Sequence, residues 1–299
     1  MPPRHLALAV LAALIWGVTF LVTRAALTEV PPLLFAALRF ACVAPFALIV
    51  PHPGVPWRVL ALLGLLLGAG QYGFQFAGMA QGVPPGLASL LTHAQAFFTV
   101  GFAAAAFGER LRGRQLAAIG LGALGLGILL VDRSGGDIPP TALLLSVAGA
   151  VCGAAGNTLL KGLGRAVDML GTAVWMSLAA PLPLLLLSLA LEGPGRIASA
   201  AMQASWTLLG ALAYSAILAT IVAFAIWGRL LTTYPAASVA PFFLLVPVFG
   251  IALSVAVTGE AFGPVRLLGC GLIFAGLLLA AIPWSRRAQA RPGRDRRAS

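Results

Sequence analysis

Residues 104–126 read AAAFGERLRGRQLAAIGLGALGL, and residues 255–277 read VAVTGEAFGPVRLLGCGLIFAGL. Each stretch carries a Gly-Glu pair, Gly108-Glu109 in the first and Gly259-Glu260 in the second, 151 positions apart. In both stretches a glycine follows eleven residues after the glutamate, and another follows five residues later. This spacing does not arise readily from an apolar composition, so the two stretches indicate an internal repeat.

The repeat extends beyond these two stretches. The same offset aligns residues 76–126 with residues 227–277 without a gap, and ten of the 51 pairs are identical. An offset of 137 relates the beginnings of the two halves, because it places Arg24 on Lys161, each at the end of an apolar segment. The predicted organisation is a first half, a second half and a basic tail, over residues 1–137, 138–284 and 285–299.

The composition places both halves in a membrane. Hydrophobic residues make up 60% of the 299 positions and charged residues only 9%, with a mean hydropathy of +0.99. Soluble domains carry about 25% charged residues, so a receptor kinase, a transporter half with its own nucleotide-binding domain and a secreted enzyme are excluded. A membrane-spanning helix needs roughly 20 apolar residues. The candidate spans are residues 5–27, 33–50, 58–80, 86–107, 114–131, 141–160, 169–190, 205–228, 236–258 and 265–284.

These segments predict an all-α integral membrane protein. Barrel strands are about ten residues long and alternate polar with apolar residues, whereas these segments are longer and continuously apolar. Lipid requires each segment to satisfy its own backbone hydrogen bonds, which a helix does. Five helices per half is an odd number, so we expect ten transmembrane helices in two inverted five-helix repeats. Alternating-access carriers use this plan, with the site near the midplane between the repeats.

The 19 lysine and arginine residues predict the orientation. If the N-terminus is inside, fourteen of them fall on inner segments and four on outer segments, while Arg39 lies within the second span. This bias predicts that both termini are cytoplasmic. Six of the fourteen lie in residues 285–299, which we interpret as an anchor near anionic lipid and not as an arm that binds nucleic acid.

Several short motifs resemble a known family. They are Leu14-Ile15-Trp16-Gly17, Leu38-Arg39-Phe40 and the Gly-Glu pairs at 108–109 and 259–260. Over residues 5–284 the chain resembles the drug/metabolite transporter superfamily, specifically its ten-helix EamA-type branch. The resemblance implies a bacterial inner-membrane exporter of amino acids or related metabolites, and one branch of that family exports aromatic amino acids. The Asn that usually follows Trp-Gly is absent here, where Val18, Thr19 and Phe20 stand, so no role of that Asn is carried over.

Polar side chains in the middle of apolar helices are costly, and each is a functional candidate. Gln71 and Gln75 share one helix face, whereas the repeat places apolar Val222 and Ile226 at their positions in the second half. We therefore expect a central cavity with one polar and one apolar wall, suited to an amphipathic solute, although each polar group has the alternative of bonding a neighbouring helix. The predicted cavity residues are Trp16, Gln71, Gln75, Thr92, His93, Gln95, Asn157, Trp175, Tyr214 and Phe243.

The charged residues do not decide whether transport is coupled to the movement of an ion. His93 is the only group near the middle of a span that titrates near neutral pH. The alternatives are proton antiport through His93, a carrier that uses glutamates near helix ends, and facilitated export down a gradient, which we favour. Arg39, Glu109 and Glu260 are interpreted as structural charges. Arg39 lies about 9 Å below the outer end of its span by helical rise, and it is expected to snorkel or to pair with Glu260, with anion binding as the alternative.

Proline predicts the moving parts. Pro181 and Pro183 in the seventh span, and Pro241 and Pro247 in the ninth, are expected to kink or loosen their helices. Pro241 and Pro247 are the predicted gating residues, although transmembrane helices also carry prolines without a gating role.

No set of residues typical of catalysis, metal binding or cofactor binding stands out. The three histidines and three cysteines lie singly, and no Walker loop, dinucleotide fingerprint or Gly-x-Ser-x-Gly sequence occurs. We therefore expect a transporter without enzyme activity, cofactor or metal, acting as a monomer or weak homodimer on a small solute such as an amino acid. The alternatives are an intramembrane enzyme, a lipid-handling scaffold and a channel.

Overall fold

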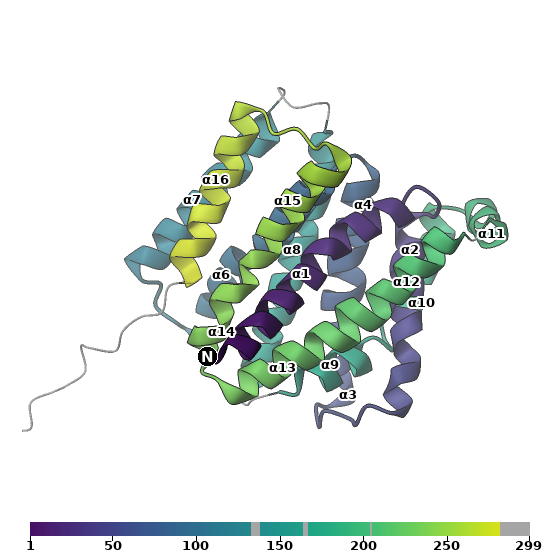
Figure 1. Cartoon of the computed structure of the whole chain (residues 1–299), viewed down its shortest axis with the longest axis horizontal. Coiled ribbons are helices and arrows are strands. Elements are labelled where there is room, and N and C mark those ends of the chain that lie inside the picture. Colours follow the sequence, from purple (N-terminus) through teal and green to yellow (C-terminus); the bar gives the residue numbers. More distant parts are fainter. Residues whose placement is uncertain (133–137, 164–166, 204, 282–299) are drawn as a thin grey trace, which may run out of the picture.

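The computed structural model describes residues 1–132, 138–163, 167–203 and 205–281, and the predicted basic tail lies outside these ranges. Every regular element in the described ranges is helical, which confirms the all-α prediction. Most of the helices run side by side in one bundle, while the short helix α11 (Pro194–Met202), which the sequence did not predict, stands at one edge (Figure 1).

The other elements follow the predicted spans closely. They are α1 (Pro3–Ala26), α2 (Pro32–Val43), the 3-10 helix η1 (Ala44–Leu48), α3 (Trp57–Leu63), the π-helix η2 (Gly64–Gly70), α4 (Gln71–Ala80), α5 (Pro85–His93), α6 (Gln95–Phe107), α7 (Gly113–Val131), α8 (Pro140–Gly162), α9 (Met169–Met176), α10 (Pro181–Leu191), α12 (Trp206–Ala213), the π-helix η3 (Tyr214–Val222), α13 (Ala223–Thr233), α14 (Ala236–Phe243), α15 (Leu245–Thr258) and α16 (Pro264–Ala281).

Eight of the ten predicted spans form helices long and apolar enough to cross a membrane, and two depart from a straight span. The second is a shorter helix over Pro32–Leu48, which tightens from α2 into η1 where Pro45 has no N–H to continue the α-helical ladder. The seventh is bent by 42° between α9 and α10. Pro181 begins α10 directly after the break, which confirms the predicted kink in this span.

The ninth span is also interrupted, at Leu244 between Pro241 and Pro247. Pro247 cannot donate to the carbonyl four residues earlier, which favours a break here. The fourth span, however, is interrupted one residue from the matching place, at Ala94, without any proline. The interruption is therefore a feature of both halves, and proline only reinforces it in the second. A gating role for Pro241 and Pro247 stays a prediction.

Other local features recur at the spacing of the sequence repeat. The 151-residue offset carries the π-helix Gly64–Gly70 onto residues 215–221, which lie within the π-helix Tyr214–Val222. Gly108 and Gly259 each end a helix with φ +66°, a conformation that favours glycine. These correspondences support an internal repeat. The inverted orientation of the two halves stays a prediction.

Charged residues distinguish the two ends of the bundle. We call the end where α6 and α8 finish and α7 begins the basic end, because Arg110, Arg112, Arg114 and Lys161 lie there. We call the opposite end, where α4 finishes and α5 begins, the acidic end; it carries Glu29, Asp132, Glu192 and Glu260. The distribution of lysine and arginine predicts that the basic end faces the cytoplasm.

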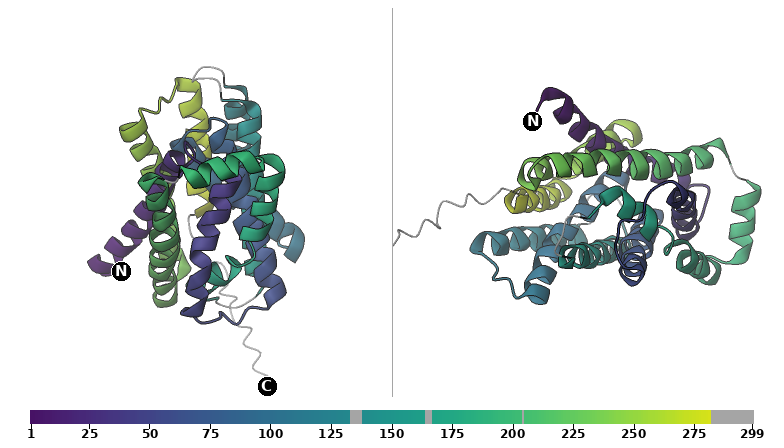
Figure 2. Two further views of the ribbon diagram at one scale, coloured as in Figure 1. Left: turned by 90° about the vertical axis from the view of Figure 1, so that its right-hand side faces the viewer. Right: turned by 90° about the horizontal axis from the view of Figure 1, so that it is seen from below.

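Small residues bring the helices close together. A Cβ on Gly125 of α7 would lie 2.6 Å from the carbonyl oxygen of Gly269 on α16, and the two helices are adjacent in every view (Figures 1 and 2). A Cβ on Gly78 of α4 would lie 2.7 Å from the carbonyl oxygen of Ala142 on α8. Close approach of this kind is typical of membrane helices, where it replaces the hydrophobic effect as a source of association.

Candidate functional site

Three glutamine side chains, Gln71, Gln75 and Gln95, lie where α4, α6 and α8 meet; we call them the amide group. Gln71 and Gln75 are 7% and 1% exposed on the face of α4 that packs against α8. A Cβ on Gly153 of α8 would lie 2.8 Å from Oε1 of Gln71 and closer still to Oε1 of Gln95. Gly149, one turn earlier, would meet the Gln71 backbone oxygen at 2.8 Å. Gly153 therefore makes room for the side chains of Gln71 and Gln95, and Gly149 allows close approach to the backbone of α4.

Several acceptor atoms in this region have no donor. Gln75 Nε2 donates to the carbonyl of Ala88 at 3.3 Å, while its Oε1 is buried without a partner. Oε1 of Gln95 is likewise buried without a partner. His93 Nδ1 lies 2.8 Å from the carbonyl oxygen of Ser89; since that oxygen only accepts, Nδ1 carries the hydrogen and Nε2 is an acceptor. His93 Nε2 is also buried without a partner.

We call Gln75 Oε1, Gln95 Oε1 and His93 Nε2 the acceptor group. Leaving a buried acceptor unsatisfied costs about 1–3 kcal/mol, and lipid offers no water to satisfy it. The arrangement therefore suits a ligand that donates hydrogen bonds.

Aromatic rings adjoin His93 on its other side. The ring centroid of His93 lies 4.9 Å from that of Phe243. Phe243 lies 5.5 Å from both Trp16 and Trp227, and Trp16 lies 5.4 Å from Phe224. We call Trp16, Phe224, Trp227 and Phe243 the aromatic cluster. Trp16 is fixed by a 2.9 Å hydrogen bond from Nε1 to the carbonyl of Ala219, so the cluster presents ordered ring surfaces next to the acceptor group.

The structure places the remaining predicted cavity residues at different distances from this region. Asn157 is partly buried on α8, one turn from Gly153 towards the basic end. Thr92 and Tyr214 donate to the carbonyls of Ala88 and Ile15, at 2.9 and 2.7 Å. Trp175 lies apart, packed on His52 and Trp57 with Nε1 donating to the Val50 carbonyl at 3.0 Å. The structure thus places Gln71 and Gln95 together around Gly153, and His93 and Trp16 together around Phe243, and it does not bring Trp175 to either set.

Four contributors were missed from the sequence. Gly149 and Gly153 carry no chemistry of their own, yet their four-residue spacing on a predicted span is the small-residue signal for close helix packing. Phe224 and Trp227 lie three residues apart on the eighth span, and this spacing would have placed them on one face. The sequence does not say which helix packs against each pair, and only the structure places both pairs at the site.

Two of the predicted structural charges, Glu109 and Glu260, have partners, and the predicted pairing of Arg39 with Glu260 is wrong. Lys161 Nζ lies 2.7 Å from Glu109. The carboxylate of Glu260 accepts from the backbone N–H groups of Gly86 and Leu87, at 2.9 and 3.3 Å, and from Ser254. Glu260 therefore caps α5 and does not pair with Arg39, because a carboxylate at a helix N-terminus satisfies otherwise unpaired N–H groups.

The cap at Glu260 gives a stability prediction. Glu260→Gln keeps the shape of the side chain but removes the charge from its hydrogen bonds, so we expect the free energy of unfolding to fall by about 2 kcal/mol. The measurement is reversible denaturation in detergent micelles. The control is Glu109→Gln, whose ion pair is about half exposed (47% and 49%) and should change stability by less than about 1 kcal/mol. Equal effects from both variants would contradict the capping role.

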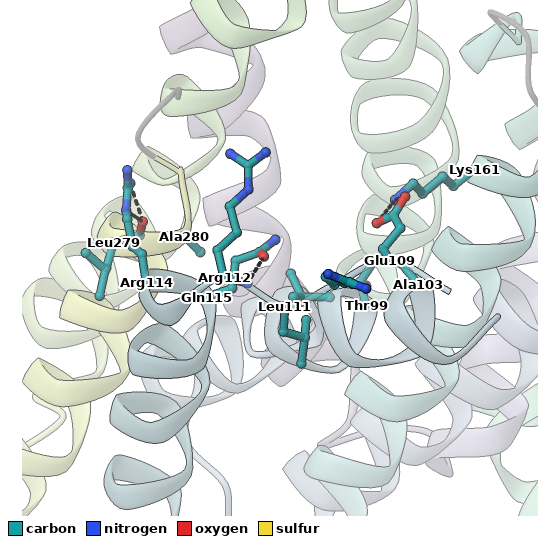
Figure 3. Close-up of a pocket in the computed structure, with 12 residues that line it drawn as sticks. Thr99, Ala103, Glu109, Leu111, Arg112, Arg114, Gln115, Lys161, Leu279 and Ala280 are labelled. Carbon is teal, nitrogen blue, oxygen red and sulfur yellow. Dashed lines mark hydrogen bonds and ion pairs between the residues drawn. The ribbon is translucent and has the colours of Figure 1, made fainter. Parts of the chain in front are cut away.

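A hollow of about 650 Å³ lies at the basic end, separate from the amide group. Figure 3 shows the Glu109–Lys161 pair on one side of it and Arg114, bonded to the carbonyl of Leu279, on the other. None of the three glutamines of the amide group lines it. Within the described residues, no group of three or more His, Cys, Asp or Glu side chains is placed to hold a metal ion.

Comparison with known proteins adds the family context. The model of the EamA-like transporter family matches twice, over residues 4–131 and 140–282. A probable amino-acid metabolite efflux pump of Salmonella typhimurium is 39% identical over 95% of this chain and 97% of its own length. A protein of Escherichia coli K12 with the same description is 37% identical, over 91% and 93%.

More distant proteins also match along most of the chain. An uncharacterized inner membrane transporter of Escherichia coli K12 is 29% identical over 90% of this chain and 88% of its own. A solved crystal structure at 23% identity superposes with a TM-score of 0.60, covering 94% of this chain and 97% of that one. That likeness supports the fold of the chain along almost its whole length.

Proposed function

Because this chain belongs to the EamA-like transporter family, we propose that it exports amino-acid metabolites, in particular amino acids with aromatic or other hydrophobic side chains. It is a multi-pass protein of the bacterial inner membrane and a transporter, not an enzyme. The efflux-pump relatives support export, and the proposal of an amino-acid solute comes from their descriptions. The residues of this chain give a physical reason why an amino acid would bind.

The observation that carries the proposal is the acceptor group beside the aromatic cluster. An ammonium group has hydrogen-bond donors and no acceptor, so it complements Gln75 Oε1, Gln95 Oε1 and His93 Nε2. The aromatic cluster offers an apolar surface to a hydrophobic side chain, and His93 touches Phe243 within it. One small molecule with an ammonium group and an apolar side chain would contact both.

We propose that transport proceeds by alternating access between the two halves. At the acidic end, Glu260 caps α5 and Glu192 caps α2 through the N–H groups of Leu33 and Leu34, at 2.8 and 3.2 Å. At the basic end Glu109, the repeat counterpart of Glu260, binds Lys161 instead, in a pair that is about half exposed. The caps at the acidic end each join two different helices, which supports opening first at the basic end.

Export is tested by counterflow in proteoliposomes. Vesicles that contain the purified protein and an internal pool of unlabelled phenylalanine or leucine are expected to take up the labelled amino acid several times faster than protein-free vesicles. Overexpression is likewise expected to raise tolerance to toxic amino-acid analogues, and Gln71→Ala or Gln75→Ala to diminish it. Counterflow no faster than in protein-free vesicles, across a broad panel of amino acids, would contradict the proposal.

The acceptor group predicts a variant that separates function from stability. Gln95→Leu removes an unsatisfied buried acceptor, so the melting temperature in detergent is not expected to fall. Counterflow of labelled phenylalanine, by contrast, is expected to slow about tenfold, the loss of one hydrogen bond to a charged group. The control is Gln81→Leu, at an exposed glutamine beside Thr141, which should leave counterflow unchanged. A Gln95→Leu protein that is unstable but fully active would reverse this assignment.

A further inference from the structure

Arg39 is buried inside the bundle, in the middle of a predicted span. It lies on α2, seven residues from the start of the helix at Pro32, which places it about 10 Å below the acidic end by helical rise. Only 3% of the residue is exposed. The structure therefore excludes the snorkelling predicted from the sequence, and a charge held at this depth is a functional candidate.

The contacts of Arg39 leave its hydrogen-bond donors unused. The guanidinium carbon lies 4.0 Å from the ring centroid of Tyr72 and 5.6 Å from that of Phe40. These rings attract the positive charge through cation–π interaction, but they accept no hydrogen bonds in the plane of the guanidinium. Its Nε and Nη1 atoms are both buried without a partner.

No carboxylate of the described residues neutralises Arg39. Each is engaged elsewhere, by Lys161, by Arg266, by a serine or by backbone N–H groups; these carboxylates are Glu29, Glu109, Asp132, Asp168, Glu192 and Glu260. The comparison with Arg266 is direct, because that residue is 4% exposed and its Nε lies 3.4 Å from the carboxylate of Asp132. Of these two buried arginines, Arg266 has an acidic partner, whereas Arg39 has none among the described residues.

Arg39 borders the same turn of α4 as the amide group. Tyr72, whose ring covers the guanidinium, lies between Gln71 and Gln75 in the sequence. At about 100° per residue, Tyr72 is offset by only about 60° from Gln75 around the helix axis. Arg39 therefore packs against the turn of α4 that carries Gln71 and Gln75.

We propose that Arg39 binds the carboxylate of the exported solute, with Nε and Nη1 as the donors. The planar guanidinium matches the two oxygens of a carboxylate, and the acceptor group would hold the ammonium of the same α-amino acid. This assignment rests on the proposed function, and it narrows the solute to molecules with a free carboxylate next to an amine.

The test compares phenylalanine with phenylalanine amide as competitors of labelled phenylalanine in counterflow. The wild-type protein is expected to bind the carboxylate compound at least about tenfold better than the amide, as for a hydrogen bond between charged groups. Arg39→Gln is expected to lose that preference. Arg39→Lys keeps the charge but not the paired N–H donors of the guanidinium, so it is expected to retain only part of the preference. Arg266→Gln is the matched control with a buried arginine, and its folded fraction is expected to keep the full preference.

Two results would overturn the proposal. One is an Arg39→Gln protein that still prefers the carboxylate as strongly as the wild type. The other is failure of Arg39→Gln to fold while Arg266→Gln folds, because that would show a structural role. A wild-type protein that transports no amino acid would instead count against the proposed function, and it would be recognised before any variant is made. Thermal stabilisation by phenylalanine, present in the wild type and absent in Arg39→Gln, is a second readout that does not depend on transport.

Discussion

Replacing Gly153 by valine is expected to reduce counterflow at least about tenfold. A Cβ at this position would lie 2.8 Å from Oε1 of Gln71 and closer still to Oε1 of Gln95, so both amides must move. Displacing Gln95 removes one of the proposed acceptors of the ammonium group, and the loss of one hydrogen bond to a charged group accounts for a factor of about ten. The measurement is counterflow of labelled phenylalanine, corrected for the amount of folded protein found by size-exclusion chromatography.

Two further variants separate the site from general packing. Gly127→Val on α7 makes the same substitution inside a membrane helix where an added Cβ meets nothing within 4 Å, and it should leave counterflow unchanged. The double variant Gly153→Val with Gln95→Ala relieves the worst contact, so its stability should recover relative to Gly153→Val alone while its transport stays low. Recovery of transport in the double variant would show that Gln95 does not bind the solute.

The second large effect is expected at Arg266. The guanidinium lies 3.4 Å from the carboxylate of Asp132, and the two side chains are only 5% and 2% exposed. Arg266→Met removes the cation from a buried ion pair, so the free energy of unfolding is expected to fall by about 3–5 kcal/mol. Reversible unfolding in detergent micelles measures this change.

Arg196→Met provides the comparison for that measurement. Arg196 is exposed on α11, and its loss should change stability by less than about 1 kcal/mol. The double variant Arg266→Met with Asp132→Leu should regain much of the lost stability, because replacing both members of a buried pair by apolar groups is often neutral. Similar losses in Arg196→Met and Arg266→Met would contradict the assigned importance of burial.

The sequence predicted the helices well because membrane spans obey a length and polarity rule that needs no partner. In the structure, the second and seventh spans depart from a straight helix at Pro45 and Pro181, where proline explains the change. The sequence also singled out Gln71, Gln75, His93 and Gln95, since polar groups are conspicuous in an apolar helix. Which helices meet around them depends on packing, and the decisive residues there, Gly149 and Gly153, contribute only the absence of a side chain.

The failures have a common cause. Arg39 was expected to pair with Glu260 because the predicted topology places both near the same face of the membrane, but Glu260 binds the N–H groups at the start of α5. Trp175 was grouped with the cavity as a residue within a predicted span, yet it packs on His52 and Trp57. The sequence predicts how deep a residue lies along its span. It does not predict which neighbouring helices that residue faces.

The hydrogen bonds between Glu260 and the start of α5 also bear on the energy needed to open the acidic end. Glu260 holds the helix by hydrogen bonds to two N–H groups and Ser254, and water can supply the same partners once that end is wetted. Releasing these hydrogen bonds costs only a few kcal/mol, which thermal fluctuation supplies. A closure of this strength is compatible with the facilitated export favoured from the sequence, in which the direction of net flux follows the relative solute concentrations on the two sides.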